Sequence, residues 1–418
     1  MKEFDFSDEN VKRTIKGDFF GRNVYITKLI NYVWEANEQT SFVVNGEWGS
    51  GKTVFMHQFM LMAKDEELSG ELGIDDYNVG DLEIYYYNAW ENELLKRPSI
   101  SLLHSIVSKY CIIDNNDKET VKEIMRKLAN VVVKIGSAGI LEGQDFMLDS
   151  DDELDIDSIR KTFEQTVDYI IRKKKCRRVV IIIDELDRCK PTDVIKFLEE
   201  IKHFYNHDKL TFIFSADLKQ LSHTINNMYG EQFDSELYLQ RFFDAIFTLN
   251  SSSYERYINE ELQYNISGTH ILNESCKIAI SHCGLSVRET NKFIKKIKVI
   301  GRQIDSLDSF EKELSIARVL FVPWGIALKY RDVTAYEAFI NGGVKKEEIK
   351  NYINCSKGLP EWVSEYYNNR CEVSEEFDIC DVLEKLYHSI FKKSGFRYYG
   401  EDYNNMQYRN VILPLIEF

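Results

Sequence analysis

The sequence predicts an α/β protein with a three-layer core, in which helices cover both faces of a parallel sheet, followed by a mostly helical C-terminal domain. Residues 179–183, VVIII, form a continuous apolar run, which is typical of a parallel strand covered on both faces. Stretches with strand and helix patterns alternate between residues 41 and 215, as in βαβ units. After about Asn250 the strand pattern fades and helical spacing dominates. These observations predict a boundary near residue 250, giving domains 1–250 and 251–418.

The elements of the first domain can be assigned in order along the chain. Apolar residues at helical spacing predict helices, and short β-branched or aromatic runs predict strands. Helices are expected over residues 25–36, 54–62, 157–171 and 192–203, and strands over residues 41–45, 82–87, 179–183 and 210–215. An inserted segment of about residues 95–160 is expected to be helical, with an acidic, solvated loop, DFMLDSDDELD, at residues 145–155.

The second domain is predicted to be helical and rich in aromatic residues. Helical spacing is found over residues 254–262, 275–282, 288–300, 310–319 and 382–391. Aromatic side chains also gather in the late segments EWVSEYYNNR, GFRYYGEDYNNMQY and VILPLIEF. One interpretation makes them the core and rim of the helical domain. The other makes them a partner-binding surface, because exposed aromatic residues anchor interfaces.

Composition argues against some classes of function. The chain has 418 residues, 44% of them hydrophobic, and a formal net charge of -15. Such a charge argues against a protein that coats nucleic acid nonspecifically, but it does not exclude one basic groove. The basic run at residues 172–175 has two interpretations, a solvated helix end before a buried strand or a contact with a polyanion. The eight cysteines form no C-x-x-C pair, the start MKEFD is too polar for a signal peptide, and the apolar stretch 128–141 is too short to span a bilayer. We therefore expect a cytoplasmic protein without a membrane span.

A glycine-rich segment, GEWGSGKT at residues 46–53, matches the pattern G-x-x-x-x-G-K-[ST]. It lies between a predicted strand and a predicted helix, which is the context that this motif requires. Glycines let backbone N–H groups face a phosphate, and the helix adds its positive end. Lys52 is expected to reach the β- and γ-phosphates, and the Thr53 hydroxyl to ligate Mg²⁺. The expected nucleotide-binding residues are Gly46, Glu47, Trp48, Gly49, Ser50, Gly51, Lys52, Thr53 and Val54.

Carboxylates that follow the apolar run predict the second half of the site. Asp184 comes directly after the run and is the expected second Mg²⁺ ligand. Glu185 is the candidate to orient and deprotonate the attacking water, so Lys52 and Glu185 are both expected catalytic residues. Two interpretations stay open for Asp187 and Arg188: a structural ion pair, or a role in signalling the nucleotide state.

Asp217, after the predicted strand at residues 210–215, also has two interpretations. It could contact the attacking water at the nucleotide site, or it could cap the next helix. The expected base is adenine, because the nearest match to the guanine signature Asn-Lys-x-Asp is NKFI at residues 291–294, which lacks the aspartate. ATP and Mg²⁺ are therefore the expected cofactors.

Taken together, these residues resemble the KAP family of P-loop NTPases. The resemblance covers about residues 15–300 and rests on the motifs DFFGR, NGEWGSGKT, YYYNAWENE, VVIIIDELDRCKP, TFIFSADLKQLSHTINNMYG, YLQRFFDAIFTL and GLSVRETNKFIKKI. The NAW and DELDR elements are the more specific ones. The resemblance implies an ATPase of the additional-strand type, with Glu185 at the catalytic-glutamate position.

The same resemblance implies further site residues. Arg241 lies where related ATPases place a γ-phosphate-sensing arginine, and Arg288 lies in the helical segment that often carries a second sensor. Either arginine could equally be a surface salt-bridge partner. If Arg241 acts in trans, a dimer or ring is expected. Asn88 and Trp90 are expected to structure the strand beside the nucleotide, the alternative for Trp90 being a core aromatic residue.

Many KAP proteins carry transmembrane helices between the two nucleotide motifs, but the corresponding interval here, roughly residues 106–159, holds only short apolar patches. The resemblance therefore implies a soluble member without that insertion. Soluble bacterial members resemble components of phage-exclusion and other conflict systems. We expect an ATP hydrolase that acts as a nucleotide-driven switch, through a protein partner or through self-association. The alternative is a nucleic-acid-stimulated motor or a phosphotransferase acting on a small substrate.

Overall fold

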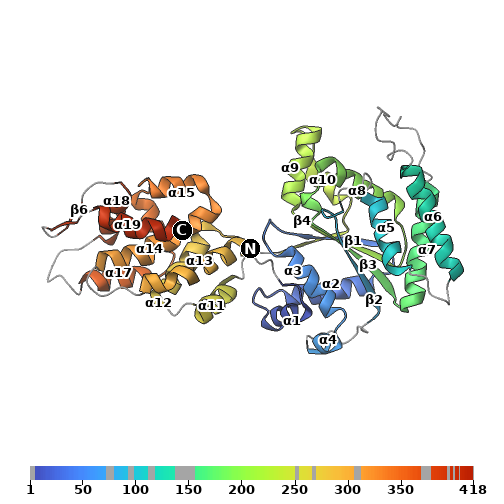
Figure 1. Ribbon diagram of the computed structural model, residues 1–418, viewed down its shortest axis with the longest axis horizontal. Helices are drawn as coiled ribbons and strands as arrows, with labels where there is room; N and C mark the ends of the chain where they lie inside the picture. The colour runs from blue at the N-terminus through green and yellow to red at the C-terminus, as the bar shows by residue number, and fades with distance from the viewer. Residues whose placement is uncertain are drawn as a thin grey trace. The chain divides into compact units, whose positions relative to one another are not determined.

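The computed structural model describes residues 5–71, 80–92, 98–111, 118–136, 156–249, 254–265, 270–305, 312–368, 378–392, 396–398, 401–403 and 405–417. The chain divides into two compact units, Met1–Asn250 and Ser251–Phe418, and each unit is described by itself (Figure 1). The acidic run predicted as a loop at residues 145–155 lies outside the described residues.

The first unit is built on a five-stranded parallel sheet. Its strands are β1 (Thr40–Asn45), β2 (Leu82–Asn88), β3 (Arg178–Asp184), β4 (Leu210–Ala216) and β5 (Ala245–Thr248). Their order across the sheet is β2-β3-β4-β1-β5, and each neighbouring pair is parallel. Strand β4 lies between β1 and β3, which is the additional strand that the predicted fold class requires. The predicted fold class is therefore confirmed.

Helices cover both faces of this sheet, which gives three layers (Figure 1). Before β3 they are α1 (Asp8–Gly17), α2 (Asn23–Glu35), α3 (Lys52–Met62), α4 (Glu66–Glu71), α5 (Pro98–Tyr110), α6 (Lys118–Gly136) and α7 (Ile156–Lys174). After β3 they are the short 3₁₀ turn η1 (Leu186–Arg188), α8 (Pro191–Phe204), α9 (Leu218–Tyr229) and α10 (Ser235–Gln240). The helices predicted in this region agree with α2, α3, α7 and α8 to within a few residues.

Strand β3 is buried along its whole length, as its apolar run predicts. Its side chains alternate between two cores, because successive residues of a strand point to opposite faces. Ile181 and Ile183 pack in the cluster that contains residues of α5, α7 and α8, whereas Val180 and Ile182 pack with residues of α1, α2 and α3. The sheet therefore holds both helical layers in place beneath the loops at its carboxyl edge.

Arg178, the first residue of β3, ties together the chain segments at the amino edge of the sheet. Its guanidinium is buried and donates hydrogen bonds to the backbone oxygens of Glu38 (3.1 Å), Asp208 (3.0 Å) and Leu210 (2.9 Å), and also to that of Ala36. Buried carbonyl groups need such partners. The entrances to β1, β3 and β4 are thus cross-linked by one side chain.

The second unit is helical, as predicted after residue 250. It comprises α11 (Tyr254–Asn265), α12 (His270–Cys283), α13 (Val287–Asp305), α14 (Lys312–Arg331), α15 (Val333–Ile340), α16 (Lys346–Ile353), α17 (Gly358–Asn368), α18 (Ile379–Phe391) and α19 (Asn405–Glu417). A small antiparallel hairpin of β6 (Phe396–Tyr398) and β7 (Glu401–Tyr403) precedes α19. The sequence pattern did not predict this hairpin.

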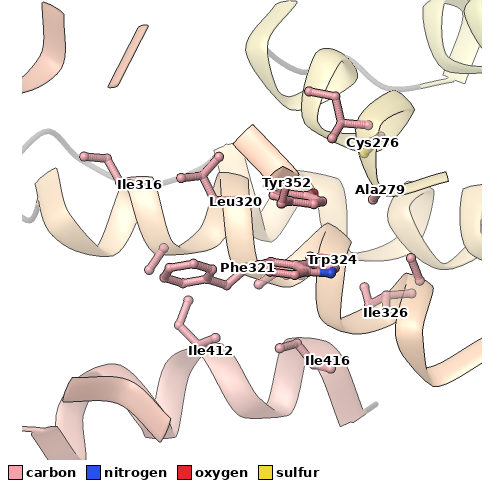
Figure 2. Close-up of a cluster of buried hydrophobic side chains, with 14 of the residues drawn as sticks. Cys276, Ala279, Ile316, Leu320, Phe321, Trp324, Ile326, Tyr352, Ile412 and Ile416 are labelled. Atoms are coloured by element: carbon pink, nitrogen blue, oxygen red, sulfur yellow. The ribbon is translucent and has the colours of Figure 1, made fainter. Parts of the chain in front are cut away.

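Helix α14 runs through the core of this unit. The rings of Trp324, from α14, and Tyr352, from α16, are stacked with centroids 4.2 Å apart and planes 4° apart. Figure 2 shows Ile412 and Ile416 of α19 pointing toward the same cluster from the other side. The burial of Ile412, Ile416 and Tyr408 supports the core interpretation for these residues of the C-terminal tail.

Two further properties concern the described helices and cysteines. None of these helices is both long and apolar enough to cross a bilayer. The seven cysteines in the described part of the chain are free thiols.

Candidate functional site

The glycine-rich loop joins the carboxyl end of β1, at Asn45, to the first residue of α3, Lys52. Gly49 and Gly51 have φ values of 82° and 88°, in the left-handed region that residues with a side chain rarely adopt. The backbone therefore curls between strand and helix, as the motif predicts. Because α3 begins at the end of this loop, its free N–H groups and positive dipole end face the same place.

Lys52 folds back across this loop. Its side chain is 9% exposed, and its ammonium donates a hydrogen bond of 2.7 Å to the backbone oxygen of Gly46. The same nitrogen lies 3.5 Å from Oδ2 of Asp187. Thr53 follows in the first turn of α3 and is partly exposed. An ammonium and a hydroxyl thus stand at the helix terminus, where a polyphosphate and its cation would need them.

Asp184 ends β3 at the same edge of the sheet as the loop, because parallel strands share their carboxyl edge. The residue is 1% exposed. Its Oδ2 accepts a hydrogen bond of 2.8 Å from the hydroxyl of Tyr86, and its Oδ1 accepts one of 2.8 Å from the backbone N–H of Glu185. Burial and the negative charge of Asp184 raise the pKa of Tyr86, so this phenol stays a donor. The carboxylate is therefore held in one orientation.

Glu185 takes a left-handed backbone conformation, with φ of 60°, and turns the chain sharply after the strand. Its carboxylate accepts a hydrogen bond of 3.2 Å from the Asn88 amide and lies 2.8 Å from the Arg188 guanidinium. Burial raises the pKa of Glu185, although Arg188 and Asn88 act in the opposite direction. A carboxylate with a raised pKa at a strand end is suited to accept a proton from water.

Asn88 and Trp90 organise the neighbouring strand end. Asn88 lies opposite Asp184 in the register of β2 and β3, and its Oδ1 accepts hydrogen bonds from the backbone N–H groups of Trp90 (3.1 Å) and Glu91 (3.2 Å). Trp90 is 49% exposed, with the Arg188 guanidinium 5.5 Å from its ring centroid. The interpretation of Trp90 as a core aromatic residue is therefore wrong, because its ring lies at the surface beside a cation.

Asp187 is the acidic residue whose surroundings the sequence did not reveal. Its carboxylate accepts from Trp48 Nε1 (2.8 Å) and from the backbone N–H of Asp217 (3.2 Å), besides contacting Lys52. The structural ion pair considered between Asp187 and Arg188 is not the one the structure forms, since Arg188 pairs with Glu185. Asp187 instead contacts Lys52, so the two residues of this motif have different ionic partners.

Asp217 and Arg22 stabilise the start of α9 and the glycine-rich loop, respectively. The Asp217 carboxylate caps α9 by accepting from the N–H of Gln220 (3.2 Å), which is the capping interpretation; its contact with a nucleotide stays a prediction. Arg22 is buried and donates to the backbone oxygens of Ser50 (2.7 Å) and Gly51 (3.3 Å). The sequence indicated Arg22 only within the motif DFFGR, because no local pattern predicts a contact across 28 residues.

Arg241 lies at the other edge of the sheet. It precedes β5, whose first residue, Ala245, pairs with Phe42 near the start of β1, whereas the loop leaves from the end of β1. Its side chain is exposed, with the guanidinium 6.0 Å from the ring centroid of Tyr238. Arg241 therefore lies at the amino edge of the sheet, whereas Lys52 of the same unit lies at the carboxyl edge. Arg288 is the second residue of α13, in the other unit, and its predicted sensor role stays a prediction.

Comparison with known proteins gives one informative match. A family model described as the KAP family P-loop domain matches residues 22–304. No curated protein matches the chain. Among solved structures, the ORC2 protein of Aeropyrum pernix, in ADPNP–ADP complexes, aligns over 96% of this chain and 94% of its own, with a TM-score of 0.32 and 10% sequence identity. A likeness at that level carries no argument about this chain.

Proposed function

The chain belongs to the KAP family of P-loop NTPases, and we propose that it binds ATP and hydrolyses it in a Mg²⁺-dependent reaction. The observation that carries this proposal is the arrangement at the carboxyl edge of the sheet. There the loop that leads to Lys52 follows β1, and Asp184 ends β3 with Glu185 directly after it, so that only β4 separates the two strands. The phosphate-binding loop, the cation ligand and the base thus follow the carboxyl ends of β1 and β3, the two strands that flank β4.

Binding of the phosphates is assigned to the loop from Gly46 to Val54. Its backbone N–H groups and the start of α3 attract the anionic chain, and Lys52 neutralises the β- and γ-phosphates. Arg22 holds the oxygens of Ser50 and Gly51, so the peptide groups on either side of Gly51 keep a fixed direction. We assign adenine as the base because the chain lacks the guanine signature at residues 291–294.

The donor set fits Mg²⁺. This ion takes oxygen ligands, keeps several waters and is bound by one or two protein groups together with substrate phosphates. The Thr53 hydroxyl and the Asp184 carboxylate supply such groups. Among the described residues each Asp184 carboxylate oxygen accepts one hydrogen bond, which leaves it a lone pair for a cation. When bound, Mg²⁺ neutralises charge that develops on the phosphate oxygens.

Glu185 is assigned as the base that orients and deprotonates the attacking water. Positioning and electrostatics account for most of the catalysis in phosphoryl transfer. The carboxylate is fixed by Asn88 and Arg188, and its partial burial raises its pKa, which strengthens it as a proton acceptor. Arg188 must rearrange or share the carboxylate with water during the reaction.

Arg241 is proposed to act on the nucleotide of a second copy of the chain. Its exposed position at the amino edge of the sheet supports an action in trans, because it is remote from its own loop. Such a head-to-tail contact generates a ring or filament if repeated, or a dimer if it closes. Arg288 is kept as a candidate second sensor.

We further propose that hydrolysis serves a switch or regulatory role, with the C-terminal helical region acting on a partner. Family membership supports a role in a bacterial antiphage or conflict system and a cytoplasmic location. The alternative is a motor stimulated by nucleic acid or a small-substrate phosphotransferase. The net charge of -15 favours the switch, because a motor needs a basic channel.

The test of hydrolysis uses two variants of the full chain. Lys52→Ala should abolish nucleotide binding, measured by calorimetry. Glu185→Gln should keep the affinity within about twofold and lower the rate of phosphate release by about 100-fold or more. Glu119→Gln, an exposed acid at the start of α6, is the charge-matched control. Turnover of Glu185→Gln at the parent rate would make the assignment of the base wrong. Strong stimulation of the parent by DNA or RNA would favour the motor.

The test of trans action mixes inactive variants. Arg241→Ala and Lys52→Ala should each be inactive alone, and mixing them should restore part of the activity, because some sites then combine an intact loop with an intact arginine. Mixing Lys52→Ala with Glu185→Gln is the control, since both residues belong to one site and no recovery is expected. Equal recovery in both mixtures, or none in the first, would contradict the assignment.

A further inference from the structure

One oxygen of Asp187 joins three segments of the candidate site. The side chain is 3% exposed, although the next residue, Arg188, reaches the surface. Its Oδ2 accepts hydrogen bonds from the Trp48 indole N–H at 2.8 Å and from the Asp217 backbone N–H at 3.2 Å. The same oxygen lies 3.5 Å from the Lys52 ammonium. The phosphate-binding loop, the turn after β3 and the loop after β4 therefore meet at a single carboxylate.

We propose that Asp187 is a positioning residue that competes with a polyphosphate for Lys52 and thereby sets the affinity for nucleoside di- and triphosphates. This proposal rests on the proposed function, because it concerns the lysine that binds the β- and γ-phosphates. In the structure the Lys52 ammonium contacts the backbone oxygens of Gly46 and Glu47 and the carboxylate of Asp187, so a phosphate that engages the ammonium must share it with a carboxylate.

The competition follows from charge. A phosphate oxygen within hydrogen-bond distance of the Lys52 ammonium brings a negative group close to Asp187, whose side chain is largely removed from water. Like charges at such separations disfavour each other, and burial reduces the screening. Asp187 therefore weakens the binding of any ligand whose phosphate reaches Lys52. A nucleoside monophosphate lacks the β- and γ-phosphates and should be affected little.

Trp48 modulates this competition. Its N–H, at 2.8 Å, lies closer to the Asp187 oxygen than the Asp217 N–H or the Lys52 ammonium, and a hydrogen bond to an anion draws charge away from the other partners. The indole ring itself is 57% exposed, so the hydrogen bond, and not burial, is what the carboxylate gains from this residue. Loss of the indole N–H should leave more of the carboxylate's charge directed at Lys52.

The test compares two variants with opposite expected signs, with ADP and AMP as probes, in the absence of Mg²⁺ and by calorimetry. Asp187→Asn keeps an oxygen acceptor of the same shape and removes the charge. It should bind ADP about threefold to tenfold more tightly than the parent, with AMP affinity changed less than about twofold. Trp48→Phe keeps the charge and removes the N–H. It should bind ADP about twofold or more weakly.

Glu119→Gln controls for the change in net charge, and circular dichroism checks that each variant is folded. Unchanged or weaker ADP binding by folded Asp187→Asn would overturn the inference, as would an equal effect on AMP. If Asp187→Asn does not fold, Trp48→Phe still decides, because unchanged or tighter ADP binding would overturn the inference. Failure of the parent to bind ADP at all would instead overturn the proposed function, and this inference with it.

Discussion

The Arg188 guanidinium lies 2.8 Å from the carboxylate of Glu185, three residues earlier in the chain. The same guanidinium lies over the exposed ring of Trp90. The residue proposed as the base is therefore paired with a cation that is itself held at the surface. This pairing gives the site a restraint that can be removed by substitution.

Removal of the Arg188 charge should speed turnover. Arg188→Ala frees the Glu185 carboxylate for water, and we expect kcat to rise about twofold to fivefold, which matches the modest strength of partly exposed ion pairs. Steady-state phosphate release at saturating ATP measures this. Arg188→Lys, which keeps the charge, is the matched control and should stay near the parent rate. A fall in kcat for the alanine variant, with ATP affinity unchanged, would mean that Arg188 assists the chemistry.

The acid limb of the activity profile should reflect the environment of Glu185. Burial raises the pKa of this carboxylate, and only its ionised form accepts a proton, so activity should be lost on acidification at a pH above the ordinary glutamate value of about 4.3. Arg188 lowers the pKa of Glu185, so Arg188→Ala should move the limb to higher pH. The profile of kcat/KM against pH measures both effects. Superimposable limbs for parent and variant would contradict this account.

Tyr86 should affect the affinity for Mg²⁺ and should not affect nucleotide binding measured without Mg²⁺. Tyr86→Phe removes the hydroxyl that donates to Asp184 at 2.8 Å, and loss of such a supporting bond commonly weakens metal sites about 10-fold to 100-fold. We expect the Mg²⁺ concentration for half-maximal activity to rise by about 10-fold to 100-fold. Tyr87→Phe is the control, because its hydroxyl donates to Ser101 on the opposite face. A similar shift in both variants would show a general loss of packing.

Trp324 should be a main determinant of stability in the helical unit. Its ring is buried and stacked on Tyr352, so Trp324→Ala should lower the free energy of unfolding by about 3–5 kcal/mol. Urea denaturation followed by circular dichroism measures the change. Val299→Ala, at an exposed position of α13, should stay within about 0.5 kcal/mol of the parent. A small loss for Trp324→Ala would mean that the surrounding core collapses into the space.

The sequence predicted the sheet because its strands are encoded locally. The run from Val179 to Ile183 is apolar at every position, as a parallel strand covered on both faces requires. Strand β5 escaped prediction because Ala245–Thr248 is four residues long, too short to show a period. Helix α14 was predicted only in part, since Pro323 lies inside it and proline normally argues against a helix interior.

The sequence predicted those parts of the candidate site that consist of consecutive residues. The glycine loop and the carboxylates after β3 are read directly from consecutive residues. The partners of those residues are not, because Trp48 and Asp187 are 139 positions apart and meet only through the strand order. The left-handed conformation of Glu185 likewise gives no signal in the sequence, because this residue is not a glycine.

The register of β2 against β3 constrains how this protein can change in length. Tyr86 and Asn88 lie opposite Ile182 and Asp184, on the same side of the sheet. Deletion or insertion of one residue within β2 would shift that pairing and turn Tyr86 toward the opposite helical layer. The phenol and the amide would then be lost from the carboxylates together. Single-residue indels in β2 should therefore be far more damaging than substitutions, and variants that tolerate changes in length should carry them outside this strand.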